Sequence, residues 1–359
     1  YSIATGTSTL TGPVILSSAT GTINASTLNT YTTSLTSTSY AIPVLNSRGA
    51  FSEFFKINIG SPLATSLITS QTWREVAFGD GVFAAVGGNP SNASARSLDG
   101  GATWSAQTMP SSSYWLAITY GGGNFVAMGG ATGTLAAYST NKILSWITST
   151  MPVSKDWLDV TYGNSRFVAV SGVTSTAAAY STNGGATWTS SSLPVSQTWF
   201  GVAYGNGNFV AVGYPNASAG DTAAYSLDNG ATWAASTLPS TKYWRRVAYG
   251  NKRFVAISGA SSNSAAYSTD GGITWIASTL PATKYWLDVV YGNGTFIATS
   301  GLPTSTGAIS LDDGETWKEY ILSSDNDWYS VAYGNGKFVM VGGNPDTVSA
   351  HISTTLTIP

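Results

Sequence analysis

The stretch Trp199–Gly213, with the sequence WFGVAYGNGNFVAVG, decides the fold of this chain. Two runs rich in aromatic and β-branched residues, 199–204 and 209–213, flank a Gly-Asn-Gly turn at 205–207. Asn-Gly at a two-residue turn supplies the positive φ angles that a type I′ hairpin requires. The stretch therefore predicts a β-hairpin.

Versions of this stretch return along the chain at a fixed interval. Seven tryptophans lead them, spaced by 42 residues with one step of 45: Trp73, Trp115, Trp157, Trp199, Trp244, Trp286 and Trp328. A second series follows the first by 31 residues, or by 34 in one repeat: Trp104, Trp146, Trp188, Trp233, Trp275 and Trp317. A fixed period of about 40 residues indicates a closed or stacked repeat architecture.

Each repeat predicts four antiparallel strands. The hairpin gives the first two, and a third strand follows, for example Ala265–Ser268. A turn then leads into a fourth strand that ends near Leu280 and Pro281. Four antiparallel strands in each repeat of this length are typical of a propeller blade.

The seventh repeat has no second tryptophan, so its fourth strand must come from elsewhere. The segment Leu63–Ser70, just ahead of Trp73, aligns with the fourth-strand endings of the other repeats. We therefore predict an all-β, seven-bladed β-propeller of four-stranded antiparallel blades, closed by an N-terminal strand that completes the last blade. Such a splice removes the exposed sheet edges of an open array.

The composition excludes several classes of function. Charged residues make up 9% of the chain, against about 25% in an ordinary soluble domain. With 15 basic and 17 acidic residues there is no basic stripe, so we expect no nucleic-acid binding. The absence of cysteine excludes disulfides, thiolate metal sites and cysteine nucleophiles. No run of 18 apolar residues predicts a membrane span, and no motif predicts a cofactor or a metal.

Residues 1–50 differ from the repeats. Serine and threonine supply 21 of these 50 residues, and the only formal charge is Arg48. Apolar, β-branched groups between the Ser/Thr tracts favour extended chain. We predict an extended Ser/Thr-rich β arm over 1–50 that serves assembly or anchoring, and the propeller over 51–359. Its partners would be copies of the chain or a larger extracellular or virion assembly, while a flexible linker is the alternative.

Six repeats carry a motif between the third and fourth strands. Ser97–Trp104 has the complete pattern Ser-x-Asp-x-Gly-x-Thr-Trp, and three other repeats match it at every defining position. Two repeats have Asn141 and Asn183 in place of the aspartate, and the first of these also has Ile143 in place of the glycine. The chain thereby resembles the Asp-box, or bacterial neuraminidase repeat, propellers. Its hairpin segments resemble repeats of bacterial surface and phage tail proteins.

We interpret the boxes as structural. Aspartate, asparagine and serine side chains hydrogen-bond to the backbone within a tight turn, and the tryptophan packs between blades. Because Ile143 lacks the freedom of glycine, we expect its turn to differ from the others. The structural positions are Asp99, Asn141, Asn183, Asp228, Asp270 and Asp312.

The resemblance to Asp-box enzymes would imply sialidase chemistry, in which three arginines hold the substrate carboxylate, a Tyr/Glu pair supplies the nucleophile and an aspartate is the acid. Of the seven arginines, Arg166 and Arg253 lie at hairpin turns on the face of the boxes. Arg245 and Arg246 are adjacent in one strand, so they are expected to point opposite ways. We therefore expect no three-arginine clamp and no enzymatic activity.

The repeats vary most in the loops of the face opposite the boxes, which makes it the candidate ligand-binding face. Aromatic rings beside hydroxyls, amides and a few charges suit sugar recognition, while a solvated rim is the alternative interpretation. The candidate ligand-binding residues are Glu75, Tyr114, Asp159, Lys242, Tyr243, Arg246, Lys284, Tyr285 and Asp288.

Three of these candidates are carboxylates. Glu75, Asp159 and Asp288 stand two positions after a leading tryptophan, near the expected central channel. They could form a set for general acid–base chemistry or for a cation. The alternative is that they line the channel and pair with Arg246 or water.

We predict from these patterns a non-enzymatic structural or recognition module of an extracellular or virion surface, displayed in many copies and binding glycans through the face opposite the boxes. Two alternatives stay open. One is a secreted glycan-processing enzyme of sialidase-like type. The other is a purely architectural filament or coat subunit whose arm adds a strand to a neighbour.

Overall fold

The computed structural model describes residues 39–45, 51–59, 63–67, 71–88, 90–130, 132–215, 218–301, 304–343 and 348–357. The named elements are all β-strands, and no helix among the described residues is long and apolar enough to cross a membrane. The chain divides into two compact units, Tyr1–Gly60 with Thr355–Pro359, and Ser61–Thr354. In the first unit β1 (Ser39–Leu45) pairs antiparallel with β2 (Phe51–Ile59). The rest of the arm predicted over 1–50 lies outside the described residues, and its boundary and role stay predictions.

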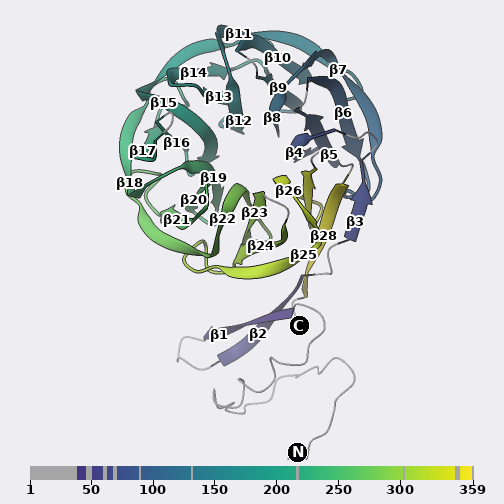
Figure 1. Ribbon diagram of the computed structural model, residues 1–359, viewed down its shortest axis with the longest axis vertical. Coiled ribbons are helices and arrows are strands. Elements are labelled where there is room, and N and C mark those ends of the chain that lie inside the picture. The colour runs from purple at the N-terminus through teal and green to yellow at the C-terminus, as the bar shows by residue number, and fades with distance from the viewer. Residues whose placement is uncertain are drawn as a thin grey trace, which may run out of the picture. The chain divides into compact units, whose positions relative to one another are not determined.

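The second unit is a ring of seven four-stranded antiparallel blades around a central channel (Figure 1). The first three blades are β4 (Trp73–Gly79), β5 (Val82–Gly87), β6 (Ser91–Ser97) and β7 (Ser105–Ser113); β8 (Trp115–Gly121), β9 (Asn124–Gly129), β10 (Gly133–Ser139) and β11 (Ile147–Lys155); and β12 (Trp157–Gly163), β13 (Arg166–Ser171), β14 (Ser175–Ser181) and the first part of β15 (Thr189–Gly205). The next three are the rest of β15, β16 (Asn208–Tyr214), β17 (Gly220–Ser226) and β18 (Ala234–Lys242); β19 (Trp244–Gly250), β20 (Arg253–Ser258), β21 (Ser262–Ser268) and the first part of β22 (Ile276–Gly292); and the rest of β22, β23 (Thr295–Gly301), β24 (Thr304–Ser310) and β25 (Lys318–Asn326).

The last blade is built from both ends of the propeller sequence. It contains β26 (Trp328–Gly334), β27 (Lys337–Gly342) and β28 (Val348–Thr357), and β3 (Leu63–Ser66) pairs with β28 as the fourth strand. The predicted closure by the segment ahead of Trp73 is therefore confirmed, and so is the seven-bladed fold.

The seven leading tryptophans form the core between blades. Each is fully buried, and Trp115 for example packs against Ala84 and Val86 of the preceding blade. In five of the seven the indole Nε1 donates a hydrogen bond to the carbonyl four residues earlier, as from Trp244 to Ser240 over 2.9 Å. A buried indole removes roughly 150–250 Å² from water, worth on the order of 5 kcal/mol, so these positions fix the spacing of the blades.

Each inner strand ends in an aromatic residue followed by glycine. The glycine recurs because the aromatic ring of the next blade lies directly against it. A Cβ on Gly205 would lie 2.0 Å from the ring of Tyr249 in the next blade, and a Cβ on Gly163 would lie 1.9 Å from the ring of Tyr204. Any larger residue would displace the neighbouring ring. The same contact joins all seven neighbouring blades, with Phe78 taking the place of tyrosine in blade one.

The Asp boxes are closed hydrogen-bonded turns, as predicted. In the first box Ser97 donates to Asp99, and Asp99 accepts from the backbone N–H and the hydroxyl of Thr103. The indole of Trp104 donates to the carbonyl of Gly101. Partial burial alone would raise the pKa of Asp99, but the bonds from Thr103 lower it to about 2.

Each box also bonds to the hairpin turn of the preceding blade. Asn208 donates to the carbonyl of Gly271, and Arg253 pairs with Glu315 at 2.7 Å. Equivalent contacts reach all six boxes, from Lys142 to Asp80, Asn124 to Gly184, Asn164 to Asn229 and Lys337 to Asp99. The boxes therefore join neighbouring blades as well as closing their own turns.

The expectation that the Ile143 turn would differ is wrong in its main point. Ile143 adopts a φ of 56° and donates its N–H to Ser139, as glycine does in the other boxes. The isoleucine side chain fits because Ile143 lies in a buried cluster with Ala84. At the position of Ala84 the other blades have the larger valine or isoleucine. In those blades the box glycine lies against that valine, as Gly230 does against Val168. The larger residue is thus matched by a smaller neighbour, and Trp146 donates to Ser94 as Trp275 donates to Ser236.

Candidate functional site

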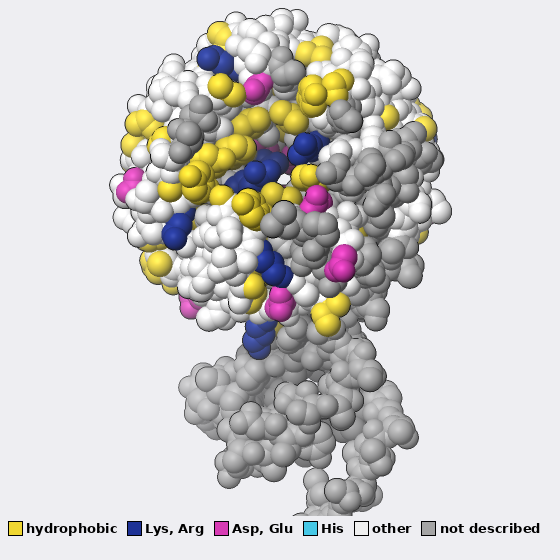
Figure 2. Space-filling view, in the orientation of Figure 1, with side chains coloured by type: hydrophobic (Ala, Val, Ile, Leu, Met, Phe, Trp, Pro, Cys, Tyr) yellow, Lys and Arg dark blue, Asp and Glu magenta, His cyan; other side chains and the backbone are white. Residues whose placement is uncertain are grey.

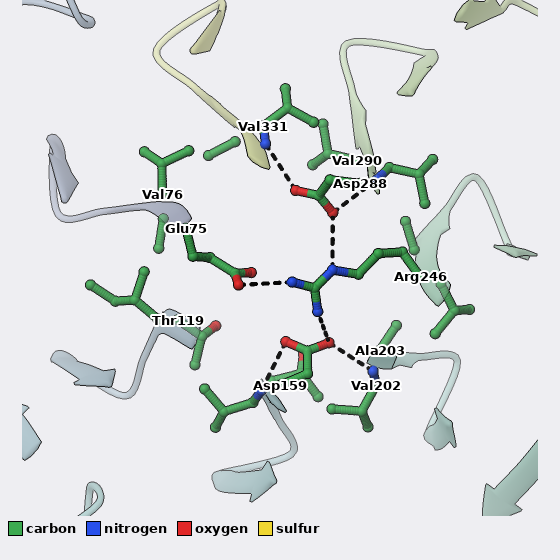
Figure 3. A pocket seen from close by; sticks show the side chains of 18 of the residues that line it. Glu75, Val76, Thr119, Asp159, Val202, Ala203, Arg246, Asp288, Val290 and Val331 are labelled. Carbon is green, nitrogen blue, oxygen red and sulfur yellow. Dashed lines mark hydrogen bonds and ion pairs between the residues drawn. The ribbon is translucent and has the colours of Figure 1, made fainter. Parts of the chain in front are cut away.

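Four charged side chains from four blades meet in the central channel (Figure 3). Arg246 of β19 forms ion pairs with Glu75 of β4, Asp159 of β12 and Asp288 of β22. The distances are 2.9 Å from Nη2 to Oε2 of Glu75, 3.1 Å from Nη1 to Oδ2 of Asp159, and 3.6 Å from Nε to Oδ1 of Asp288. The three carboxylates therefore line the channel and pair with Arg246, which is one of the two arrangements that the sequence left open.

Every inner strand has a β-bulge directly before the position that these charged residues occupy. The register skips the residue after each leading tryptophan, so that Trp244 and Arg246 pair with consecutive residues of β20 and Arg245 is the extra residue. A bulge redirects side chains relative to regular alternation. The two residues after each tryptophan therefore do not follow the alternation on which we based the opposite directions of Arg245 and Arg246.

The carboxylates also bind the backbone of the next blade. Oδ2 of Asp159 accepts a hydrogen bond from the N–H of Val202, and Oδ2 of Asp288 accepts one from the N–H of Val331, both at 2.8 Å. At the equivalent position of the last blade the hydroxyl of Ser330 accepts from the N–H of Val76. The cluster therefore holds inner strands together both across and around the channel.

Burial dominates the electrostatics of the cluster. It raises the pKa of Glu75 well above its usual range and that of Asp159 to about 6, although the Arg246 charge opposes both shifts. It also raises the pKa of Asp288. Burial alone would lower the pKa of Arg246, but the three carboxylates raise it above its ordinary value. Three acids that share one guanidinium titrate as a unit, and burial moves this titration to higher pH.

In this arrangement the guanidinium occupies the space between the carboxylates that a cation or a substrate would otherwise take. The described residues include no group of three or more acidic or imidazole side chains placed to hold a metal ion. The cluster lines a cavity of about 320 Å³, whose wall continues along the inner strands to Tyr204 and Tyr249. The cluster chiefly joins the blades of the ring through ion pairs.

An aromatic cluster lies on the candidate face, where the inner strands begin. Phe200 stacks on Tyr214 with ring centroids 4.9 Å apart, and Tyr214 meets Tyr243 edge-on at 4.8 Å. The guanidinium carbon of Arg245 lies 5.3 Å from the Phe200 ring centroid. Figure 2 shows a face on which Lys and Arg side chains gather in the central hollow and hydrophobic side chains surround them. This surface combines rings with cationic groups.

The other candidates of this face lie apart at separate blade junctions. Tyr114 and Tyr285 are 38% and 42% exposed, and among the described residues neither ring contacts another aromatic ring. Lys284 forms an ion pair with Glu319 at 2.8 Å and contacts Thr306. Lys242 is partly buried at the end of β18. Only Tyr243 of these interblade candidates joins the aromatic cluster.

The sequence analysis did not select Phe200, Tyr214 or Arg245 as site residues, nor Tyr329, whose ring centroid lies 4.6 Å from the guanidinium carbon of Arg74. A usable signal was present, because three of them follow a leading tryptophan directly, at the bulge. Arg166 and Arg253, by contrast, lie where predicted, each bonded to an Asp box of the next blade.

Comparison with known proteins agrees with this architecture. The BNR/Asp-box repeat family model matches residues 266–275, which contain the fifth box. The chain is a BNR-type, Asp-box β-propeller. No curated protein sequence is significantly similar to it.

Solved structures resemble this Asp-box propeller in fold alone. A structure described as YCF48 bound to D1 peptide is 15% identical, with a TM-score of 0.64 over 88% of this chain and 98% of that one. YCF48 from Cyanidioschyzon merolae is 14% identical, with a TM-score of 0.63 over 82% and 99%. The computationally designed Ika8 protein is 11% identical, with a TM-score of 0.53 over 79% and 98%.

Proposed function

We propose that this propeller is a non-enzymatic recognition module that binds glycans through the face opposite the Asp boxes. The observation that carries the proposal is the aromatic cluster of Phe200, Tyr214 and Tyr243 beside Arg245. Aromatic rings cover the apolar faces of sugars, and nearby polar groups bind their hydroxyls. Exposed Tyr285 adds a further ring on the next junction.

The state of the channel carboxylates supports a non-enzymatic role. Asp159 and Asp288 each accept two backbone hydrogen bonds and face Arg246, and Glu75 pairs with the same guanidinium. A general acid or base must reach the proton that it transfers. These side chains are directed at the protein's own groups.

We further propose that the module is displayed in many copies on an extracellular or virion surface, such as a phage tail fibre, as a homo-oligomer or adhesion subunit anchored through residues 1–50. The Ser/Thr-rich composition of that segment and the few charges of the whole chain support this setting. A purely architectural subunit and a secreted glycan-processing enzyme are the competing functions.

Glycan-array binding of the full chain, with mass spectrometry of the bound sugars, tests this proposal. We expect binding without turnover, and loss of binding in Tyr243→Ala. Ile321→Ala is the matched control, because Ile321 is 71% exposed on the outer strand β25. Cleaved sugars would favour the enzyme. Binding of no glycan would contradict the proposal, and a D1-like peptide, the ligand class of one similar structure, would then be the first alternative to test.

A further inference from the structure

The residues that directly follow the leading tryptophans form a ring at the channel mouth. They occupy the bulge of each inner strand, and most are half-buried. The leucines of this ring each lie over a glycine at the end of the second strand or just after it, as Leu116 does over Gly130 and Leu158 over Gly172. Five members are apolar or aromatic and two are arginines: Arg74, Leu116, Leu158, Phe200, Arg245, Leu287 and Tyr329.

Both arginines are held in place by glycine and an aromatic ring. The stem of Arg74 lies over Gly88, where a Cβ would come within 2.0 Å of Cγ. Its guanidinium carbon lies 4.6 Å from the centroid of Tyr329 in the preceding blade. Arg245 repeats this arrangement over Gly259 and against Phe200. A guanidinium stacked on a ring keeps its in-plane N–H donors available and is already ordered before a ligand binds.

Neither arginine forms an ion pair within the part of the propeller that the structure describes. Nε of Arg74 and Nε of Arg245 are buried and have no hydrogen-bond partner there. Arg246, only one residue further on, is instead committed to three carboxylates. Burial lowers the pKa of Arg245 to about 10, and the positive charges of Arg246 and Arg74 lower it as well.

We propose that Arg74 and Arg245 bind the carboxylate or sulfate groups of an acidic glycan. The planar fork of arginine matches both groups with paired hydrogen bonds. The rings of Phe200, Tyr214 and Tyr329 beside the arginines provide apolar faces for the sugar. This proposal rests on the proposed function and specifies its ligand class.

Calorimetric titration of the full chain with three probes tests it: a glucuronate-containing oligosaccharide, a sulfated oligosaccharide and a neutral oligosaccharide of equal length. We expect tighter binding of an acidic probe than of the neutral one, by at least tenfold. We also expect this affinity to fall as NaCl rises from 50 to 300 mM, because screening weakens charge contacts. The preferred probe identifies the group that the arginines bind.

The double variant Arg74→Met with Arg245→Met keeps the apolar stems and should lose at least tenfold in affinity for the acidic probe. Its matched control is Arg166→Met, since Arg166 stacks on Tyr180 at the same 4.6 Å but lies at an Asp box of the other face. Equal affinity for acidic and neutral probes would overturn the acidic subsite and leave the proposed function standing. Binding of no glycan at all would overturn both, and so would capture of an acidic peptide instead. If the double variant does not fold, the salt dependence of the unchanged protein decides.

Discussion

Arg246 donates a hydrogen bond to Glu75 across the channel over 2.9 Å, joining residues 171 positions apart in the sequence. The contact links blade five to blade one, and the same guanidinium reaches Asp159 and Asp288 in blades three and six. One side chain thus ties four of the blades together at the centre of the ring.

Loss of the two partners should have unequal effects on stability. Arg246→Gln leaves buried carboxylates unpaired and should lower the free energy of unfolding by about 3–5 kcal/mol. Glu75→Gln should change it by less than about 1 kcal/mol, because the amide oxygen can still accept the hydrogen bond from Arg246 and no buried charge is left unpaired. Urea denaturation of both variants measures the difference. Equal losses of unfolding free energy would contradict the larger role of Arg246 in the cluster.

The stability of the propeller should fall as pH rises from about 4 to about 6. The unfolded chain releases the Asp159 proton near pH 4, whereas the folded chain holds it up to about pH 6, so the folded state binds more protons in this window. This contribution is present below about pH 4 and is lost as pH passes about 6. Asp159→Asn should flatten the slope of Tm against pH, while Asp325→Asn, at an exposed position, should not. A Tm that rises through this window would contradict the prediction.

Ile143 and Ala84 should be energetically coupled. Ile143→Gly opens a cavity beside Ala84 and should cost about 1–3 kcal/mol. Ala84→Val overfills the same cluster and should cost a similar amount. The double variant recreates the glycine–valine contact of the other blades, so it should regain at least about 2 kcal/mol over the sum of the single losses. Additive losses in a double-mutant cycle would show that the two sites are independent.

An Asp box should tolerate asparagine but not alanine. Asp228 accepts hydrogen bonds from Ser226 and from both the N–H and the hydroxyl of Thr232. Asn183 makes the same set with its amide, donating to Thr187 where aspartate would accept. Asp228→Asn should therefore cost less than about 1 kcal/mol, and Asp228→Ala about 1–3 kcal/mol. Thermal unfolding compares the two, and an asparagine variant as unstable as the alanine variant would argue against this role of the box.

Sequence alone predicted the fold because its determinants are local and repeated. Trp244, Gly205 and the boxes each recur at a fixed spacing, so one strand pattern implies all the blades. The missing second tryptophan of the last repeat was enough to place the closing strand, β3.

The site could be predicted less completely from the sequence, because it depends on departures from regular strand geometry. The bulge at Arg245 cannot be seen in strand alternation, and the stacking of Phe200 on Tyr214 depends on the bulge in the pairing of β15 with β16. The compensation of Ile143 by Ala84 joins residues 59 positions apart in different repeats. Such pairs become visible only when neighbouring blades are placed side by side.

Time-resolved saturation-transfer NMR of the full chain with the glucuronate-containing oligosaccharide decides between recognition and catalysis, because one spectrum reports both binding and turnover. We expect transfer to the sugar protons, lost in the Arg74→Met, Arg245→Met double variant, with no new reducing-end signals over a day. Absence of transfer to any glycan probe, or the steady appearance of reducing-end signals, would contradict this expectation.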